Sequence, residues 1–202
     1  MDVWWIGDDS ASRRSVDEIR DLLGRNDGWL WVDIPSFDPE AERLLGMVLN
    51  FHPRAVQDCA QRNHVPKVHA YPDHLFLVVH CPEVSEGGGH VHYVELDQFV
   101  GTRYLVTLHG PLNPAVPLET ALRQTGEAAQ RLETGRLRPA SPYALSYAIV
   151  SSIVRRPAPR CKAALAMRVA RRLVTVPERG GATVRTFGAV SSAASSAVPP
   201  WG

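Results

Sequence analysis

The sequence predicts an α/β domain of the α+β kind, with three layers in which a mixed, mostly antiparallel sheet is covered by helices. Strand-like and helix-like segments alternate over the first 60 residues, strand-like segments dominate from residue 64 to 109, and helical periodicity follows from residue 114. A sheet with helices packed on its faces is one of the few arrangements that buries the apolar side of every such segment. Because 45% of the residues are hydrophobic, the chain can build a core of its own.

The first elements follow from short patterns near the N-terminus. Val3–Ile6 is an apolar run that we expect to form an edge strand. Ser15 and Glu18 form a capping box, which predicts a short helix that ends near Gly24. Trp29–Ile34 is aromatic and β-branched and is followed by proline, so it is predicted to be a strand.

Two helices are expected before the main run of strands. Asp38 is a good N-cap and is followed by proline and glutamate, both of which suit the first turn of a helix. A second helix is predicted from Pro53 through Ala60. The first of these helices presents an apolar face made of Leu44, Leu45, Val48 and Leu49.

The middle of the chain predicts a meander of strands. His64–Tyr71 alternates, and His74–His80 is almost entirely apolar, which favours a strand buried on both faces. Gly87–Gly89 indicates a hairpin turn before His90–Val100, and Arg103–His109 follows after a second turn. Helical patterns then run from Pro114 and from Ser141, the second carrying Leu145, Ile149, Ile153 and Val154.

Charge divides the chain into two parts. Residues 1–154 carry 13 basic and 20 acidic residues, whereas residues 155–202 carry 9 basic residues and a single acid, Glu178. We therefore expect a folded domain over 1–154 and a basic tail over 155–202, rich in Pro, Ala, Gly and Ser, that is disordered. Within the tail, Cys161–Val174 could form a basic amphipathic helix. Its basic stretch Lys162–Arg172 could lie on an anionic membrane, or could belong to an unselected segment.

Several classes of protein are excluded or disfavoured by the same sequence. No segment approaches the ~20 apolar residues of a membrane-spanning helix, and the N-terminus lacks the basic start of a signal peptide. The formal net charge of +1 argues against a nucleic-acid binder. Three widely spaced cysteines, Cys59, Cys81 and Cys161, favour a reducing, cytoplasmic setting. No phosphate loop and no nucleophile elbow occur, so no enzyme activity is predicted.

The histidines offer one candidate metal site. All eight lie between His52 and His109, and the pair His90 and His92 would share one face of a strand. With a third ligand from a neighbouring strand, this pair could bind zinc, either as a real site or adventitiously. The alternative is that the histidines are ordinary surface or packing residues. Lys67, between apolar strand residues, is expected to pack its stem and pair with an acid.

Four segments of the chain occur in an informative order and at consistent spacing. They are Trp31-Val32-Asp33 with the helix start at Asp38-Pro39-Glu40; residues 51–58, FHPRAVQD; Pro66-Lys67-Val68 with Tyr71 and His74–Val79; and residues 99–109, FVGTRYLVTLH. Together they resemble the cytoplasmic domain of CorA-type magnesium and cobalt transporters. They cover roughly 60% of the chain, and the combination is more specific than any single segment.

The resemblance implies a cation-sensing domain that helps to gate a transporter. In the family, the acid at the position of Asp58 helps to hold a regulatory Mg²⁺ against a neighbouring subunit, and a second acid often precedes it, where this chain has Gln57. The intact family member is implied to be a homopentamer whose domain lies on the cytoplasmic face of the membrane. We expect this chain by itself to be a monomer or a weak dimer.

The chain departs from the family after residue 154. The stalk helix, the membrane helices and the Gly-Met-Asn signature are absent, and the tail resembles no family segment. We therefore expect a truncated or frameshifted product that cannot transport ions alone and that would meet the membrane only through the missing helices. The alternative hypothesis is a stand-alone metal-binding or interaction protein that uses the histidine-rich sheet.

Overall fold

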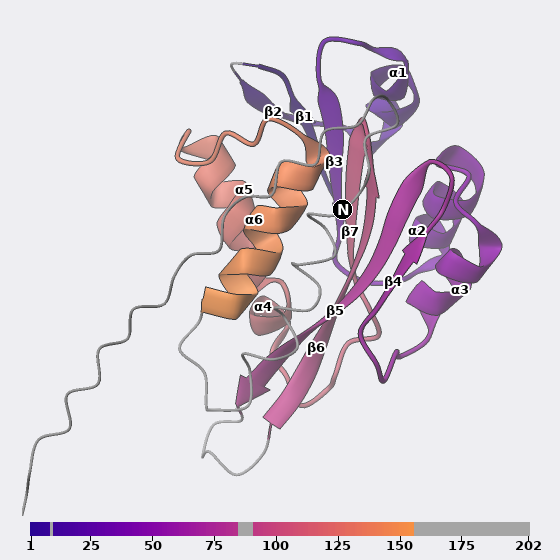
Figure 1. Ribbon diagram of the computed structural model, residues 1–202, viewed down its shortest axis with the longest axis vertical. Helices are drawn as coiled ribbons and strands as arrows, with labels where there is room; N and C mark the ends of the chain where they lie inside the picture. The colour runs from indigo at the N-terminus through magenta and orange to yellow at the C-terminus, as the bar shows by residue number, and fades with distance from the viewer. Residues whose placement is uncertain (9, 85–90, 156–202) are drawn as a thin grey trace, which may run out of the picture.

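The computed structural model describes residues 1–8, 10–84 and 91–155. Within these residues the chain forms one sheet of seven strands in the order β2-β1-β3-β7-β6-β5-β4 (Figure 1). The strands are β1 (Asp2–Ile6), β2 (Ala11–Arg14), β3 (Trp29–Ile34), β4 (Lys67–Ala70), β5 (His74–Val84), β6 (Val91–Gly101) and β7 (Tyr104–His109).

The sheet is mixed but mostly antiparallel, as predicted. β3 and β7 pair in parallel, from Leu30 opposite Tyr104 to Ile34 opposite Leu108, and the other five pairings are antiparallel. The long hairpin of β5 and β6 carries β4 on its outer edge, so the residues of these three strands form rows across the sheet. One such row contains Lys67, Val78 and Asp97.

Helices cover both faces of the sheet and complete the three layers (Figure 1). One face carries the short helices that precede β4, and the other carries the helices that follow β7. The first group is η1 (Val16–Glu18), α1 (Ile19–Gly24), α2 (Pro39–Arg43), η2 (Leu44–Val48) and α3 (Pro53–Ala60). The second group is α4 (Leu118–Ala121), α5 (Arg123–Glu133) and α6 (Pro142–Arg155).

Alternation along the strands sends side chains to two separate cores. Trp31, Leu96 and Leu105 belong to the core under α5 and α6, whereas Val32, Phe99 and Val106 belong to the core under α1, α2 and α3. From α6, the predicted residues Leu145, Ile149 and Ile153 enter the first core. The three-layer α+β prediction is therefore confirmed.

Local capping accounts for several helix starts. The Ser15 and Glu18 capping box is present at η1, and the Asp38 side chain accepts a hydrogen bond from the Ala41 amide at 2.8 Å. At α6, the Ser141 hydroxyl accepts from the Ala144 amide at 3.2 Å. These caps satisfy backbone donors that the first turn of a helix leaves without a partner.

The structure differs from the sequence prediction in three places. Val3–Ile6 was expected at an edge of the sheet, but β1 is internal because Ala11–Arg14, a segment with little apolar content, pairs outside it. The strand expected over His64–Tyr71 is confined to β4. The apolar segment after α2 contains a π-helical turn, Leu44–Val48, instead of a regular α-helix. The turn at Gly87–Gly89 lies outside the described residues, as does the tail after residue 155.

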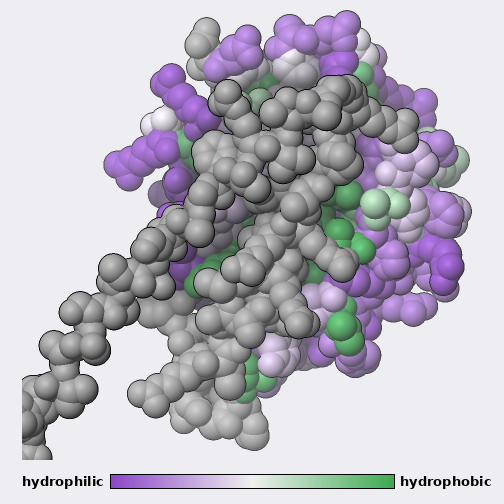
Figure 2. Space-filling model, viewed as in Figure 1, coloured by the Kyte–Doolittle hydropathy of each residue, from purple (hydrophilic) through white to green (hydrophobic). Residues whose placement is uncertain are grey.

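The described surface is largely hydrophilic in the view of Figure 2. None of the helices among residues 1–8, 10–84 and 91–155 combines the length and the apolar character needed to span a membrane.

Candidate metal centre

Helix α3 carries both residues that the family resemblance assigns to a regulatory cation. The helix begins at Pro53, and the Nδ1 atom of His52 accepts a hydrogen bond from the Arg54 amide at 3.2 Å. Its buried face packs into the core and consists of Ala55, Val56 and Cys59. Gln57 and Asp58 lie outside that face, where Gln57 is exposed and Asp58 is half-buried.

Asp58 forms an ion pair with Lys67 of β4. The Lys67 Nζ atom lies 2.7 Å from Asp58 Oδ2, and the two side chains are 27% and 35% exposed. This length is typical of a charge-assisted hydrogen bond between an ammonium and a carboxylate. The contact fixes the end of α3 to the outermost strand of the sheet and confirms the expectation that Lys67 pairs with an acid.

A buried carboxylate lies on the same face of the sheet as this ion pair. Asp97 of β6 is fully buried, and the Cys59 thiol, a weak donor, lies beside its carboxylate, whose oxygens make no other hydrogen bond within the described residues. Burial, reinforced by the charge of Glu95, raises the pKa of Asp97 well above its usual range, and Cys59 and Lys67 oppose that rise only in part. Burial, followed by the nearby Asp97, also raises the pKa of the Cys59 thiol.

Glu95, two residues before Asp97 on the same strand, is held by the loop that follows α3. The Asn63 backbone amide donates to Glu95 Oε2 at 2.8 Å, and the Asn63 side-chain amide donates to Oε1 at 2.6 Å. The same Asn63 side chain donates to the Asp58 carbonyl at 2.9 Å. His80 lies 3.9 Å from Glu95, but burial lowers the pKa of His80, which favours its neutral form. We call Asp58, Glu95 and Asp97 the acidic cluster.

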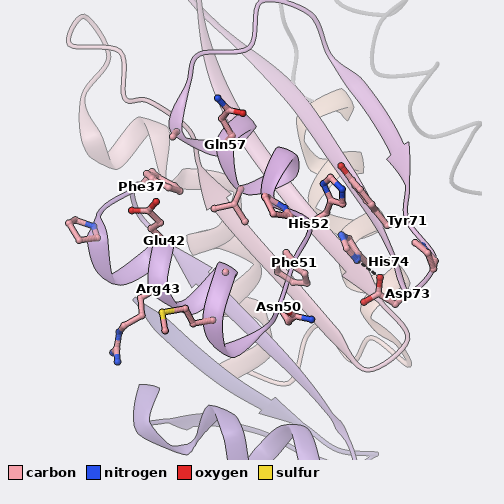
Figure 3. A pocket seen from close by; sticks show the side chains of 17 residues that line it. Phe37, Glu42, Arg43, Asn50, Phe51, His52, Gln57, Tyr71, Asp73 and His74 are labelled. Atoms are coloured by element: carbon pink, nitrogen blue, oxygen red, sulfur yellow. Dashed lines mark hydrogen bonds and ion pairs between the residues drawn. The ribbon is translucent and has the colours of Figure 1, made fainter.

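Gln57 faces a different environment from Asp58. It lines a groove of about 1020 Å³ between η2, α3 and the turn before β5, whereas Asp58 does not line it (Figure 3). On the opposite side of this groove His74 Nδ1 lies 2.8 Å from Asp73 Oδ1, and Tyr71 stacks between His74 and His52. Consecutive side chains on a helix point about 100° apart, so the Gln57 amide would approach an ion bound at Asp58 at a large angle to the Asp58 carboxylate.

The histidines are dispersed over the described part of the chain. His52 caps α3, His74 is buried beside Asp73, and His109 lies under α5. His92 is half-buried on β6 opposite Glu83, and His90 lies outside the described residues. In residues 1–8, 10–84 and 91–155, no three His, Cys, Asp or Glu side chains are grouped so that they could hold a metal ion.

The buried acids Glu95 and Asp97 were not identified from the sequence. Their signal was present, because Glu95 and Asp97 lie between apolar residues in Val94–Val100, a segment of an internal strand that also contains Gln98. A carboxylate rarely enters a core without a partner, so such a pattern marks a functional or strained position.

Comparison with known proteins gives consistent results. The chain matches the model of the CorA-like Mg²⁺ transporter protein family over residues 26–161. It is 31% identical over 88 residues to the putative metal ion transporter YfjQ of Bacillus subtilis, a match that covers 44% of this chain but only 26% of that protein. The chain thus matches about a quarter of the length of this curated relative.

Solved structures share the fold at low sequence identity. The full-length CmaX protein has a TM-score of 0.59 at 15% identity, covering 76% of this chain and 45% of that one. The CorA magnesium transporter of Methanocaldococcus jannaschii has a TM-score of 0.57 at 14% identity, covering 77% and 44%. The ZntB cytoplasmic domain of Vibrio parahaemolyticus has a TM-score of 0.51 at 15% identity, covering 76% and 57%. Because the family model spans more than half of the sequence, this chain belongs to the CorA-like Mg²⁺ transporter family.

Proposed function

We propose that this domain senses Mg²⁺ for a CorA-type transporter, with Asp58 as the principal ligand and Gln57 as a second oxygen ligand. The observation that carries the proposal is the position of Asp58, a partly exposed carboxylate on α3 whose partner is the flexible side chain of Lys67. Mg²⁺ is commonly bound through one or two carboxylates and keeps several of its waters. A single aspartate near the surface therefore suits a weak, exchangeable site better than a closed cage.

The proposed role is regulatory and not enzymatic. One carboxylate and one amide leave most of the coordination sphere open, so we propose that a neighbouring subunit of a homo-oligomer, a pentamer in the intact family member, supplies further ligands. A cation bound between two subunits favours the arrangement in which they are bridged, and its loss shifts the population towards others. On this proposal the domain lies on the cytoplasmic side and does not itself conduct ions.

Titration of the full chain with MgCl₂, followed by amide NMR resonances, tests the assignment of Asp58. We expect saturable shifts in α3 at millimolar Mg²⁺, and we expect Asp58→Asn to abolish them because it removes the charged ligand. Asp21→Asn, which removes an exposed acid of α1, is the matched control and should leave the titration unchanged. Equal titration curves for the wild type and Asp58→Asn would reject Asp58 as the ligand.

A parallel titration with ZnCl₂ separates this proposal from the histidine-based alternative. The alternative requires tight Zn²⁺ binding that is lost in His92→Ala and unaffected by Asp58→Asn. The cation-sensing proposal instead requires that His92→Ala leave the Mg²⁺ response of α3 intact.

A further inference from the structure

We infer that Lys67 is a tethered competitor for the cation site, whose ammonium occupies the place at Asp58 that a divalent cation must take. The inference rests on the proposed function and specifies how that site is regulated. The Lys67 Nζ atom is in direct contact with Asp58 Oδ2 at 2.7 Å. A divalent cation bound to the same carboxylate would lie beside this ammonium and be repelled by it, so the cation binds only when Lys67 moves away.

The position of Lys67 allows this exchange. β4 is the last strand of the sheet and has only four residues, so Lys67 belongs to an edge and not to the interior. Its side chain is 27% exposed, and its four-carbon stem can carry the ammonium into solvent without movement of the backbone. The competitor is therefore mobile, whereas Asp58 is held on a helix whose neighbouring residue Cys59 is fully buried.

Lys67 lies close to a second acid of the acidic cluster besides Asp58, the buried Asp97. Lys67 and Asp97 lie in one row across β4, β5 and β6, on the face of the sheet that α3 covers. Departure of Lys67 would leave Asp58 without its ion-pair partner, next to the buried acid Asp97. A divalent cation at Asp58 restores the positive charge, so ammonium and metal ion are alternative occupants of one electrostatic position.

This exchange sets the concentration at which the domain responds. Each binding event must first break the Asp58–Lys67 ion pair, which lowers the apparent affinity of Asp58 for the cation. A sensor of an abundant ion requires a low affinity for that ion. The ion pair with Lys67 lowers the affinity of the site while Asp58 remains the ligand. Replacing Lys67 with a neutral residue should therefore tighten Mg²⁺ binding.

The first test compares the Mg²⁺ dissociation constants of full-length variants in the NMR titration. We expect Lys67→Gln to bind Mg²⁺ at least about fivefold more tightly than the wild type, and Lys67→Arg to stay within about twofold because it retains a tethered cation. Arg54→Gln removes an exposed charge one helical turn from Asp58, where no ion pair with Asp58 is formed, and controls for general electrostatics. A Lys67→Gln affinity no higher than that of Arg54→Gln overturns the inference.

The second test observes Lys67 directly in the wild-type chain. The sequence contains only two lysines, Lys67 and Lys162, so lysine side chains labelled with ¹³C at Cε give two assignable signals. Added Mg²⁺ should move the Lys67 signal towards that of a solvated lysine, with the same dissociation constant as the α3 amides. A Lys67 signal that is unchanged at saturating Mg²⁺ overturns the inference. Because the measurement uses the wild-type chain, it does not depend on whether a variant folds.

The two tests separate failure of the inference from failure of the proposed function. If Asp58→Asn does not alter Mg²⁺ binding, the assignment of Asp58 as the ligand is wrong, and the proposed competition by Lys67 is refuted as well. If Asp58→Asn abolishes binding but Lys67→Gln fails to tighten it, the domain still senses Mg²⁺ and only the competition is refuted.

Discussion

Two aspartates on opposite faces of the sheet, Asp33 and Asp97, are partnered in different ways. Under α5 and α6, a β3/β7 cluster is made of Trp31, Asp33, Thr107, His109 and Thr125, which are joined by three hydrogen bonds and by a 3.4 Å contact between His109 and Asp33. Under α3, Asp97 is fully buried and, within the described residues, its carboxylate has only the weak donor of the Cys59 thiol beside it. The unsatisfied acid lies on the face that carries the candidate metal centre, and the connected cluster lies on the face that does not.

The β3/β7 cluster is connected because its members come from neighbouring strand ends. Trp31 Nε1 donates to Thr107 Oγ1 at 3.0 Å, and Thr107 Oγ1 donates to Asp33 Oδ1 at 2.5 Å. His109 Nε2 lies 3.4 Å from Asp33 Oδ1 and 3.0 Å from Thr125 Oγ1 of α5. The parallel pairing of β3 and β7 places Asp33 directly opposite Thr107, with Trp31 and His109 at neighbouring positions on the same face of the two strands.

The largest expected effect is that of Thr107→Val, which should lower the free energy of unfolding by about 2–3 kcal/mol. The substitution keeps the shape of the side chain but leaves the buried Trp31 indole N–H without an acceptor and removes a donor from Asp33. Urea denaturation at pH 7 measures the change. Thr107→Ser keeps the hydroxyl and should lose only about 1 kcal/mol, the value of a buried methyl group. Equal losses for the two variants would show that the hydroxyl contributes nothing.

Asp97→Asn should have the opposite sign and raise the free energy of unfolding at pH 7 by about 1–2 kcal/mol. The change removes an ionisable group whose charged form is strongly disfavoured by burial and by Glu95, while the size of the side chain is kept. Asp21→Asn, at an exposed acid, controls for the change in net charge and should have almost no effect. A large loss of stability in Asp97→Asn would show that the Asp97 carboxyl is satisfied in a way that the fold requires.

The pH dependence of stability should change in the same variant. Because the pKa of Asp97 is raised in the folded state above its ordinary value of 3.8, the folded chain retains a proton that the unfolded chain has lost. Stability therefore falls as pH increases from about 4 towards the raised pKa. Glu95 and Asp58 strengthen this dependence, whereas Cys59 and Lys67 weaken it. Asp97→Asn should flatten this part of the profile, and an unchanged slope would assign it to another group.

Sequence patterns were reliable where local chemistry decides the structure. Trp29–Ile34 and Pro53–Ala60 have the predicted bounds, because prolines mark the end of one segment and the start of the other. The π-helical turn at Leu44–Val48 was not predicted, since its apolar spacing is also that of an α-helix. β2 was missed because backbone pairing, and not apolar alternation, fixes Ala11–Arg14 at the edge of the sheet.

The candidate site shows the same limit. The sequence predicted that Lys67 pairs with an acid, but the identity of that acid depends on how α3 crosses β4. The burial of Asp97 likewise depends on the register of β5 and β6 and on the position of Cys59 above the sheet. These relations are long-range and have no local signal. The assignment of Asp58 and Gln57 to a cation came from the family resemblance and remains a prediction.

The smallest expected effect lies at the exposed edge of the sheet, at Arg13 of β2. Its guanidinium contacts Asp2 at 3.0 Å and Glu133 at 2.9 Å, and it lies over the Trp4 ring at 4.7 Å. All three charged side chains are about half exposed, so water and salt screen these contacts. Arg13→Gln should therefore lower the free energy of unfolding by less than about 1 kcal/mol.

Salt concentration distinguishes this exposed contact from the buried β3/β7 cluster. In 1 M NaCl the Debye length falls to about 3 Å, so the difference between Arg13→Gln and the wild type should shrink. The difference between Thr107→Val and the wild type should persist, because Thr107 is fully buried and its hydrogen bonds are not screened. Urea denaturation of both variants at low and high salt measures the two responses. If the Thr107→Val difference also disappears at high salt, long-range charge and not local hydrogen bonding stabilises the cluster under α5 and α6. The contrast between the two faces of the sheet would then be wrong.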